Sequence, residues 1–562
     1  MLDYRNKLDL WIDCVEDESL AAELCSMRDA GDDSVIADAF FKDLEFGTAG
    51  LRGVIGAGTN RMNVYTVGRA TQGLADYLNS RFERPSVAIA RDSRHMGEVF
   101  VRHAASVLAA NGVSVHVYPR IEPTPALSFA VRDLGCAGGI CMTASHNPAA
   151  YNGYKVYGAD GCQITSEDAS DISAAIAKVD PFSGVKAVPF EEAERAGLIR
   201  WIDEGTLDRY IDAVAAVGVD PGADADLKVV YTPLCGCGRE CVERILARIG
   251  VTDVAVVREQ GEPNGDFPTC EYPNPEERAA LQKGIDLCEE VRPDLLLATD
   301  PDADRVGVAV KDDGRYILLS GNEMGVLLLD YLARRAIEEG RTLDRRIVAT
   351  TIVSSTMVDA LADKYGFAVR RVLTGFKYIG GIIGELESCG EEERFLFGFE
   401  ESYGYLNGTY VRDKDAVDAS MLICQMARYY KARGLNLAQA MRTLYEEHGF
   451  YRNKTLSFSF PGAAGAAGMA DLMAGLRADP PVLLANRPVT RLVDYRLGEG
   501  GLPPANVVEF SVEGDHKVVF RPSGTEPKVK AYVFASGSDA EAADRVVSEL
   551  EDEVRHFVEG FC

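Results

Sequence analysis

The sequence predicts an α/β protein in which three similar domains are followed by a smaller α+β domain. Two features predict this class. The first is a threefold repeat of apolar strands alternating with helices, and the second is a C-terminal segment in which two strands flank a loop and precede a helix. The chain has 562 residues, which is enough for three or four domains of ordinary size.

Each copy of the repeat has the same order: a strand, a helix that ends at glycine, and two further strands. The copies occupy strand 87–90, helix 98–110, strand 113–118 and strand 139–142; strand 229–231, helix 239–249, strand 251–257 and strand 294–298; and strand 346–352, helix 355–365, strand 367–373 and strand 395–397. The last strand of each copy runs into a polar motif, in turn TASHNP, TDPDADR and GFEESYG. Because open α/β sheets bind ligands beyond the carboxyl ends of their strands, we expect the three motifs to face one cleft.

The two ends of the chain differ from the repeat. Residues 1–40 have the apolar spacing of an amphipathic helix that is rich in Asp and Glu. Near the C-terminus, strands at 517–520 and 528–534 flank the motif RPSGTEP, and a helix is predicted over 539–557. The segment PGAAGAAGMA (461–470) consists largely of small residues and predicts a loose connection.

The composition excludes several classes of protein. Hydrophobic residues make up 47% and charged residues 26%, a soluble globular mixture, and no apolar run approaches the roughly 20 residues that span a bilayer. The N-terminus lacks the apolar core of a signal peptide, and the net charge of −28 disfavours nucleic acid and anionic membranes as partners. Thirteen cysteines occur without metal-ligand spacing, the one close cluster being Cys235, Cys237 and Cys241. Reduced thiols in the cytoplasm are the simplest interpretation.

The motif TDPDADR is a candidate metal loop. It places Asp300, Asp302 and Asp304 at alternate positions after an apolar strand, so that three carboxylates can converge on one hard cation such as Mg²⁺. An EF-hand loop is excluded, because its glycine and its final glutamate are replaced by Arg305 and Lys311. A solvated acidic turn is the alternative.

The motif TASHNP contains the candidate nucleophile Ser145. A serine beside His146 in sequence is no hydrolase triad, since triad partners meet in space, and no G-x-S-x-G elbow is present. By itself Ser145 therefore fits a turn better than a catalytic role. Lys155, ten positions on in YNGYK, would serve as a proton carrier if its pKa were lowered, and is otherwise a surface lysine.

Two further motifs have the residues of an anion site. RPSGTEPK offers the Arg521 guanidinium, the Ser523 and Thr525 hydroxyls and a backbone opened by Gly524, although a plain hairpin turn fits equally well. FGTAGLRG combines small residues with Arg52 in a similar way. No Walker A motif is present, and the glycine pair at 236 and 238 lacks the third glycine of a dinucleotide fingerprint.

Two polar motifs of the third repeat fit a sugar. GFEESYG places Glu400 and Ser402 two positions apart, on one side of an extended segment, where they suit neighbouring hydroxyl groups. A strand end with a charged tip is the alternative. The motif LTGFKYIGG adds Thr374, Gly375 and Lys377 as a second polar loop.

Taken together, the motifs resemble those of the α-D-phosphohexomutase family, in the family's order and over almost the whole chain from Phe46 onward. TASHNP resembles its phosphoserine loop, DPDADR its magnesium loop, GFEES its sugar-binding loop and RPSGTEP its phosphate-binding loop. GTAGLRG, GFKYIG and GFEESYGYL are most similar to the branch that holds bacterial phosphoglucomutases and the animal phosphoglucomutase/phosphopentomutase type. The resemblance implies mixed sheets and four domains around a central cleft, which we place at 1–204, 205–315, 316–440 and 441–562.

The resemblance also implies a role for each motif residue. Ser145 would carry a phosphoryl group and, with Asp300, Asp302 and Asp304, would bind Mg²⁺. The other residues near the serine would be Arg52, His146 and Lys155, the last as general acid or base. Substrate would be held by Arg305, Thr374, Gly375, Lys377, Glu400, Ser402, Arg521, Ser523, Gly524, Thr525 and Lys528. The sequence departs from many hexomutases at Tyr403, which stands where they have glycine.

The implied activity is that of a phosphoglucomutase, which interconverts glucose 1-phosphate and glucose 6-phosphate with glucose 1,6-bisphosphate as intermediate and activator. Phosphomannomutase, phosphopentomutase and bisphosphate-forming activities are alternatives on the same scaffold. A phosphatase would share the aspartates, whereas a non-catalytic phosphosugar sensor would lack them or the serine. Either a monomer or a homodimer is expected.

Overall fold

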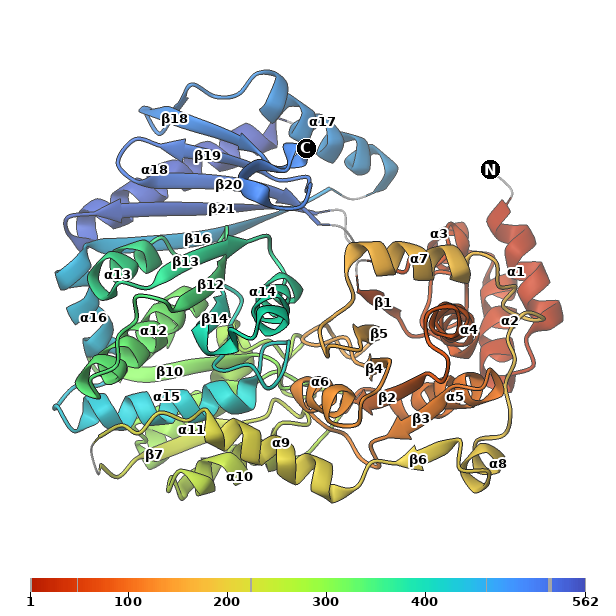
Figure 1. The fold of residues 1–562 in the computed structure, drawn as a ribbon. Helices are drawn as coiled ribbons and strands as arrows, with labels where there is room; N and C mark the ends of the chain where they lie inside the picture. The colour runs from red at the N-terminus through yellow and green to blue at the C-terminus, as the bar shows by residue number, and fades with distance from the viewer. Residues whose placement is uncertain (1–2, 48, 223–224, 461, 524–527, 561–562) are drawn as a thin grey trace.

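The computed structural model describes residues 3–47, 49–222, 225–460, 462–523 and 528–560. Four β-sheets follow one another along the chain, three of them covered by helices on both sides and the last by helices on one side (Figure 1). The predicted class, three α/β domains with mixed sheets and a C-terminal α+β domain, is confirmed. We keep the predicted domain boundaries as a proposal, although cuts after residues 315 and 440 would divide strand β11 and helix α16.

The chain begins with three helices in place of one amphipathic stretch: α1 (Asp3–Cys14), α2 (Glu18–Ala30) and α3 (Asp33–Phe40). Asp17 and Asp32 cap the second and third helices through their carboxylates, and Gly31 ends α2 with a left-handed φ of 66°. Their apolar sides pack together around Trp11 and Phe40, and this cluster also contains Ala57 of the first domain.

The first domain holds a six-stranded sheet of order β1-β5-β4-β2-β3-β6. Strands β2, β3, β4 and β6 are parallel, and β5 and β1 continue the sheet in antiparallel pairing. Its elements are β1 (Gly50–Val54), α4 (Val64–Arg81), β2 (Ser86–Arg91), α5 (Gly97–Ala110), β3 (Ser114–Val117), α6 (Thr124–Asp133), β4 (Gly138–Met142), β5 (Tyr151–Gly158), α7 (Ser166–Ile176), α8 (Phe190–Arg195) and β6 (Ile199–Trp201). The central strands are nearly continuous apolar runs because both of their faces are buried.

The second and third domains repeat this plan with sheets of order β11-β10-β9-β7-β8 and β13-β12-β14-β15. The second contains α9 (Glu204–Ala216), β7 (Lys228–Thr232), α10 (Arg239–Arg248), β8 (Asp253–Val256), α11 (Arg278–Val291), β9 (Leu295–Thr299), β10 (Val306–Asp312) and β11 (Arg315–Leu319). The third contains α12 (Gly321–Glu338), β12 (Ile347–Thr351), α13 (Met357–Tyr365), β13 (Ala368–Val372), α14 (Phe376–Cys389), β14 (Phe395–Glu400), β15 (Gly404–Leu406), α15 (Ala416–Lys431) and α16 (Leu437–His448). In both, an antiparallel strand follows the polar motif, so each motif forms the turn between two paired strands.

The last domain is an antiparallel sheet of order β16-β21-β20-β19-β18-β17 with two helices on one face. Its elements are β16 (Phe450–Ser459), α17 (Gly462–Ala478), β17 (Leu483–Leu484), β18 (Arg487–Asp494), β19 (Val508–Val512), β20 (His516–Pro522), β21 (Lys528–Gly537) and α18 (Ala540–Glu559). The loose connection predicted over 461–470 is wrong, because residues 462–478 form α17, and its Leu472 and Leu476 are buried in the core. Residue 461 itself lies outside the described residues.

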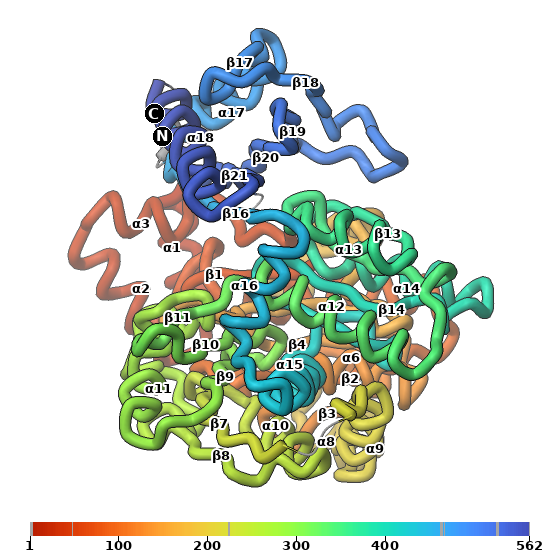
Figure 2. Tube along the Cα trace, turned by 90° about the vertical axis from the view of Figure 1, so that its left-hand side faces the viewer, coloured from red at the N-terminus to blue at the C-terminus, as the bar shows by residue number. Residues whose placement is uncertain are grey.

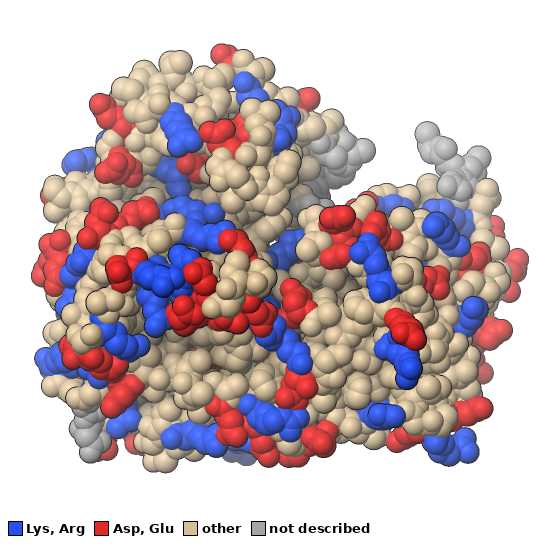
Figure 3. Space-filling model, in the orientation of Figure 1, with Lys and Arg blue, Asp and Glu red and all other residues tan. Residues whose placement is uncertain are grey.

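One large hydrophobic cluster connects the first three domains, the first and second domains each have a further cluster, and the last domain has its own. A single cluster of buried side chains runs from Ala88 in the first domain to Tyr445 in the third. The last domain meets the others through a smaller cluster around Ile352 and Val519, and it stands above them in both views (Figures 1 and 2). The surface is hollowed between this domain and the first (Figure 3).

Two expectations from composition can be compared with the fold. The cysteines in the described part of the chain are all free thiols, and most of them are buried. Within the same part, no helix combines the length and the apolar character that a membrane crossing requires.

Candidate active site

Ser145 lies in the turn that follows β4, with its backbone in the left-handed region. Its φ is 52°, and its N–H donates to Thr143 Oγ1 at 2.8 Å. A non-glycine residue in this conformation costs about 1–2 kcal/mol, so the surroundings must hold it there. The side chain is buried, and its Oγ donates to Asp300 Oδ2 of the second domain at 2.7 Å. The turn therefore presents the serine hydroxyl to the aspartate loop across a domain interface.

The three aspartates of the second domain converge in a tight turn between β9 and β10. Asp300 Oδ1 accepts the N–H groups of Asp304 and Arg305, both at 3.0 Å, which closes the turn. Ala303 at its tip has a φ of 51°. One carboxylate oxygen from each aspartate lies within 4.8 Å of the others, and all three side chains are fully buried.

The aspartate loop fits a divalent cation because two of its buried carboxylate oxygens lack hydrogen-bond partners among the described residues. Asp302 Oδ1 and Asp304 Oδ1 are buried and have no hydrogen-bond partner among the described residues. An orphaned buried carboxylate oxygen is costly, and hard oxygen ligands are what Mg²⁺ prefers. Within the described residues, this is the one group of acidic, histidine or cysteine side chains close enough to hold a metal ion. The cysteine cluster at 235–241 does not form such a group.

The pKa values of Asp300 and Asp302 shift in opposite directions. Burial and the neighbouring carboxylates of Asp302 and Asp304 raise the pKa of Asp300 well above its usual value. Burial would also raise the pKa of Asp302, but Lys155, a hydrogen bond with Asp300 and the charge of Lys414 together outweigh it and lower that pKa. The site thus has one carboxyl group that favours its proton next to the serine hydroxyl.

Lys155 lies on β5 and reaches the aspartates, with its Nζ 2.7 Å from Asp302 Oδ2 and 3.2 Å from Asp304 Oδ2. Burial alone would lower the pKa of Lys155, but these two carboxylates raise it well above its usual value. These carboxylates therefore act against the lowered pKa that a proton carrier needs, and the role of Lys155 as general acid or base stays a prediction. A bound cation would compete with the lysine for the same carboxylates.

Lys414 is a second buried lysine at the aspartates, and the sequence reasoning missed it. Its Nζ lies 2.8 Å from Asp304 Oδ2 and 3.2 Å from Asp413 Oδ1. Burial would lower the pKa of Lys414, but Asp304, Asp413 and Glu400 outweigh it and raise that pKa. The only local signal was the alternating segment RDKD at 412–415, which reads as ordinary surface charge until the fold buries it.

Two predicted residues flank the serine in the first domain. His146 Nδ1 lies 3.2 Å from Ser145 Oγ, and burial together with Arg305 and Arg52 lowers the pKa of His146 well below its usual value. His146 is therefore neutral near pH 7. Arg52 is exposed on β1, donates to Asn147 Oδ1 at 3.3 Å, and lines a cavity of about 250 Å³ together with Ser145 and Lys155.

The predicted sugar loop is a hairpin and not an extended segment. β14 ends at Glu400 and β15 begins at Gly404, and these two residues pair across a turn. Ser402 therefore lies at the turn, not on the same side of a strand as Glu400. Glu400 is buried, and burial raises its pKa in spite of the opposing charges of Lys414 and Arg305.

Arg305, predicted to contact substrate, is held within the second domain, where its Nη1 donates to Glu276 Oε1 at 3.0 Å.

Tyr403, the departure noted in the sequence, belongs to the hydrophobic core. Its side chain is 8% exposed, and its φ of 65° lies in the left-handed region, which explains why glycine is the easier residue at this turn. The ring is accommodated by packing in the large shared core.

The second polar loop of the third domain precedes helix α14. Gly375 has a φ of 120°, which only glycine adopts without strain, and Thr374 Oγ1 is buried without a hydrogen-bond partner in the described structure. Lys377 lies in the first turn, where burial lowers its pKa. The Cys162 thiol of the first domain donates to the Lys377 carbonyl at 3.4 Å, so the start of α14 lies against the first domain.

The predicted phosphate loop joins β20 to β21 in the last domain. Arg521 lies one residue before the end of β20, and the Ser523 N–H donates to the Lys528 carbonyl at 2.7 Å, which returns the chain to β21. Gly524 and Thr525 lie outside the described residues. Lys530, which the sequence reasoning missed, adds a small contribution to the lowered pKa of His146 and slightly opposes the burial that raises the pKa of Glu401. The last domain therefore brings positive charge to the serine from the opposite side.

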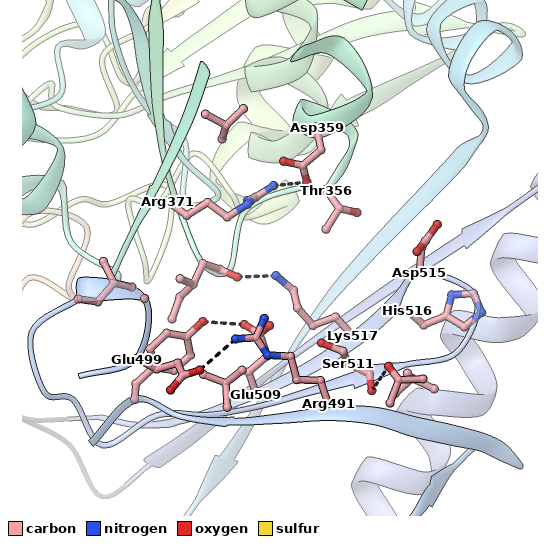
Figure 4. A pocket seen from close by; sticks show the side chains of 18 of the residues that line it. Thr356, Asp359, Arg371, Arg491, Glu499, Glu509, Ser511, Asp515, His516 and Lys517 are labelled. Carbon is pink, nitrogen blue, oxygen red and sulfur yellow. Dashed lines mark hydrogen bonds and ion pairs between the residues drawn. The ribbon is translucent and has the colours of Figure 1, made fainter. Parts of the chain in front are cut away.

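A cavity of about 810 Å³ lies elsewhere, between the third and last domains (Figure 4). Three of its cationic side chains already have protein partners. Arg371 pairs with Asp359, Arg491 with Glu499, and Lys517 donates to a backbone carbonyl (Figure 4). These three cations are therefore already paired within the protein, at the joint between the two domains.

The fold and the site define a class of multidomain α/β proteins in which a buried serine meets a metal-fitting aspartate triad at a domain interface. Three family models match the chain: phosphoglucomutase/phosphomannomutase α/β/α domain I at residues 43–182, domain II at 208–314 and domain III at 320–448. The chain belongs to the phosphoglucomutase/phosphomannomutase family, the α-D-phosphohexomutases, as the motifs predict.

Individual relatives agree with this assignment. The chain is 35% identical to a phosphoglucomutase of Staphylococcus epidermidis over 539 residues, which cover 94% of this chain and 96% of the relative. It is 36% identical to a Haemophilus influenzae protein named "Probable phosphomannomutase", over 88% of this chain and 98% of the relative. The solved open form of the phosphoglucomutase parafusin from Paramecium has the same fold, with a TM-score of 0.69 at 18% identity over 92% of this chain and 95% of that one.

Proposed function

We propose that this chain is a phosphoglucomutase that interconverts glucose 1-phosphate and glucose 6-phosphate through a phosphorylated Ser145. One observation carries the proposal: Ser145 Oγ lies 2.7 Å from Asp300 Oδ2, so a potential phosphoryl carrier touches a loop that fits a divalent cation. Relatives named phosphoglucomutase that match nearly the whole chain support the choice of reaction. A homologous N-acetylphosphoglucosamine mutase has been solved in complex with glucose 1,6-bisphosphate, which supports that compound as the intermediate here.

The reaction proceeds by two phosphoryl transfers. Phosphoserine 145 passes its phosphoryl group to the 6-hydroxyl of glucose 1-phosphate, which gives glucose 1,6-bisphosphate and free serine. The bisphosphate turns end for end within the cleft. Ser145 Oγ then takes the phosphoryl group from C1, and glucose 6-phosphate leaves. Such transfers depend on in-line positioning and on neutralisation of charge more than on covalent help from the protein.

The residues of the chain divide this work among the domains. Asp300, Asp302 and Asp304 would hold Mg²⁺, which when bound offsets the negative charge of the transferring group. Neutral His146, 3.2 Å from Ser145 Oγ, is suited to accept the serine proton when phosphoserine forms again. Lys155 and Lys414 stay protonated and add positive charge beside the aspartates.

Substrate is held from the other side of the cleft. Arg521, Ser523 and Lys528, with Gly524 and Thr525 of the same motif, would bind the phosphate that does not react, because a guanidinium and hydroxyls on a tight loop suit that anion. Glu400, Ser402, Arg305, Thr374, Gly375 and Lys377 would contact the sugar or its phosphate. The last domain is joined by its own smaller interface, so closing it over the substrate would exclude water from the phosphoserine.

A panel assay tests the proposal. Glucose, mannose, ribose and deoxyribose 1-phosphates are supplied with Mg²⁺, with and without glucose 1,6-bisphosphate, and both 6- or 5-phosphate product and free inorganic phosphate are measured. We expect the highest kcat/KM on glucose 1-phosphate, with activation by the bisphosphate and almost no free phosphate. Release of inorganic phosphate as the main product would instead identify a phosphatase. A higher kcat/KM on mannose 1-phosphate would favour the phosphomannomutase that one relative's name suggests.

The covalent step is tested by intact-mass analysis of the purified protein. An added mass of one phosphate that disappears in Ser145→Ala supports Ser145 as the carrier. The same added mass on Ser145→Ala would assign the phosphoryl group to another residue.

A further inference from the structure

Arg94 is a buried arginine beneath the serine turn to which neither the motifs nor the proposed reaction gives a role. It lies between β2 and α5 and is 3% exposed. Its guanidinium lies 3.3 Å from Asp92 Oδ2 through Nε, and its other two nitrogens donate to the backbone. Nη2 donates to the carbonyl of Ser145 at 2.6 Å and to that of Asn147, and Nη1 donates to the carbonyls of Pro148 at 2.8 Å and Tyr151 at 2.9 Å. One planar group thus holds four carbonyl oxygens of the loop that carries the serine.

The same guanidinium contacts a second residue with a left-handed backbone. Phe267, in a loop of the second domain, has a φ of 44° and is 2% exposed, and the Arg94 guanidinium lies 4.9 Å from its ring centroid. A bulky aromatic residue in this region is strained, and such strain persists only where the surroundings impose it. Arg94 therefore contacts one strained residue from each of the two domains that meet at the site.

A second set of contacts links the Arg94 loop to the same serine turn. Asp92 Oδ1 accepts the Arg94 N–H at 2.9 Å, and Asp92 Oδ2 accepts the Thr143 hydroxyl at 2.6 Å. Thr143 Oγ1 in turn accepts the Ser145 N–H at 2.8 Å. The serine turn is thus held at its N–H by Asp92 through Thr143 and at its carbonyl by Arg94.

The Arg94 loop also presses closely on the second domain. His95 Nε2 lies 2.6 Å from Asp266 Oδ1, and a Cβ added at Gly265 would meet Ser93 O and His95 N at 2.9 Å. Only glycine permits this approach. Since Asp300 of the same second domain accepts the Ser145 hydroxyl, the Arg94 loop lies at the joint that sets the serine against the aspartates.

We infer that Arg94 is a positioning residue, which holds the Ser145 backbone in its left-handed turn so that Oγ points at the aspartate loop of the second domain. The inference rests on the proposed function of Ser145 as phosphoryl carrier. Arginine suits this role because its fixed fork offers several donors in one plane and also stacks on an aromatic ring, whereas lysine offers a single point of charge. Arg94 acts through the backbone of the serine turn and touches none of the substrate loops.

The experiment compares Arg94→Met, Arg94→Lys and a matched control, Arg91→Met. Arg91 ends β2 three positions earlier, and its guanidinium pairs only with Glu98, at 3.3 Å, among the described side chains. Dephosphorylated enzyme is mixed with excess glucose 1,6-bisphosphate and Mg²⁺, and the rate constant of phosphoserine formation is followed by quenched mass spectrometry. A loss of folded protein lowers the amplitude of this reaction, whereas misplacement of the serine lowers its rate constant.

We expect the rate constant to fall about 100-fold in Arg94→Met, because a misplacement of ~1 Å has an effect of that order. Arg94→Lys should recover only part of it, and Arg91→Met should stay within about threefold of the wild type. The KM for glucose 1-phosphate should change less than about threefold in all variants. Should Arg94→Met fail to fold, Phe267→Leu removes the stacking ring while keeping an apolar side chain, and a rate constant about 10-fold lower is expected.

Two results would overturn the inference: a rate constant in Arg94→Met or Phe267→Leu within threefold of the wild type, or a loss confined to amplitude. A KM that rises while the rate constant stays unchanged would assign Arg94 to substrate binding instead. If the wild type and Arg91→Met also form no phosphoserine, the proposed function fails and not the positioning role.

Discussion

Replacing Ser145 by alanine and by glycine separates the chemistry of the serine from the strain of its turn. Both changes remove Oγ, and with it the hydrogen bond to the buried Asp300 carboxyl. Loss of a partner by a buried acceptor costs about 1–3 kcal/mol, so each variant should be less stable than the wild type by this amount before the backbone is considered. Both should also lose the covalent route and about 10⁴-fold or more in kcat.

The backbone distinguishes the two variants. At a φ of 52°, glycine relieves about 1–2 kcal/mol of strain that alanine keeps, but it loses up to about 1 kcal/mol through the greater entropy of its unfolded chain. Ser145→Gly should therefore be more stable than Ser145→Ala by up to about 2 kcal/mol, although both are inactive.

The assay pairs thermal unfolding with a coupled measurement of glucose 6-phosphate. Ser128→Ala is the control, because Ser128 is equally buried in the first domain and its hydroxyl donates to the Gly161 carbonyl at 2.6 Å. It should lose similar stability and keep its activity within about threefold. Appreciable turnover by either Ser145 variant would refute the nucleophile, and a Ser145→Ala more stable than Ser145→Gly would refute the strain argument.

Three further predictions concern the metal loop, the phosphate loop and the domain joint. Mg²⁺ should raise the melting temperature of the wild type but not of Asp302→Asn, because Asp302 Oδ1 is a buried oxygen without a hydrogen-bond partner among the described residues. An equal rise in both proteins would show that Asp302 does not bind the metal. Arg521→Ala should raise the KM for glucose 1-phosphate about 10- to 100-fold with a smaller change in kcat, because charge-assisted hydrogen bonds contribute ~1.5–3 kcal/mol; an unchanged KM contradicts the phosphate-loop assignment. Burial, partly offset by Glu509, lowers the pKa of Lys517 from 10.5 to about 8. Between these two pH values the unfolded chain binds more protons than the folded chain, because only the folded lysine has lost its proton. The free energy of unfolding should therefore rise by ~3 kcal/mol from pH 8 to 10.5. A series of unfolding measurements over this pH range should show the rise in the wild type and not in Lys517→Met.

Local sequence patterns were sufficient to predict most helices and strands and to recognise the family. Apolar strands such as 87–90 and 139–142, closed helices and turn motifs are set by neighbours in sequence, because burial of a strand demands apolar residues wherever it forms. Local signals failed at two places. The small residues after 461 form α17, since alanine is a strong helix former and the core takes up its apolar side. The segment from Glu400 to Gly404 turns because its strand must pair back on itself.

The motifs alone identify this chain as an α/β phosphohexomutase, with Ser145 and the three aspartates as its candidate centre. How distant residues meet becomes clear only once the domains are folded together. Lys155 contacts Asp302 from 147 positions away, and this ion pair reverses the expected direction of its pKa shift. Lys414 and Arg94 look like surface charges in the sequence, and only the packing of one domain against another buries them beside the site. The reason is physical: charge–charge energies depend on separation and burial in space, and neither is fixed until the domains pack.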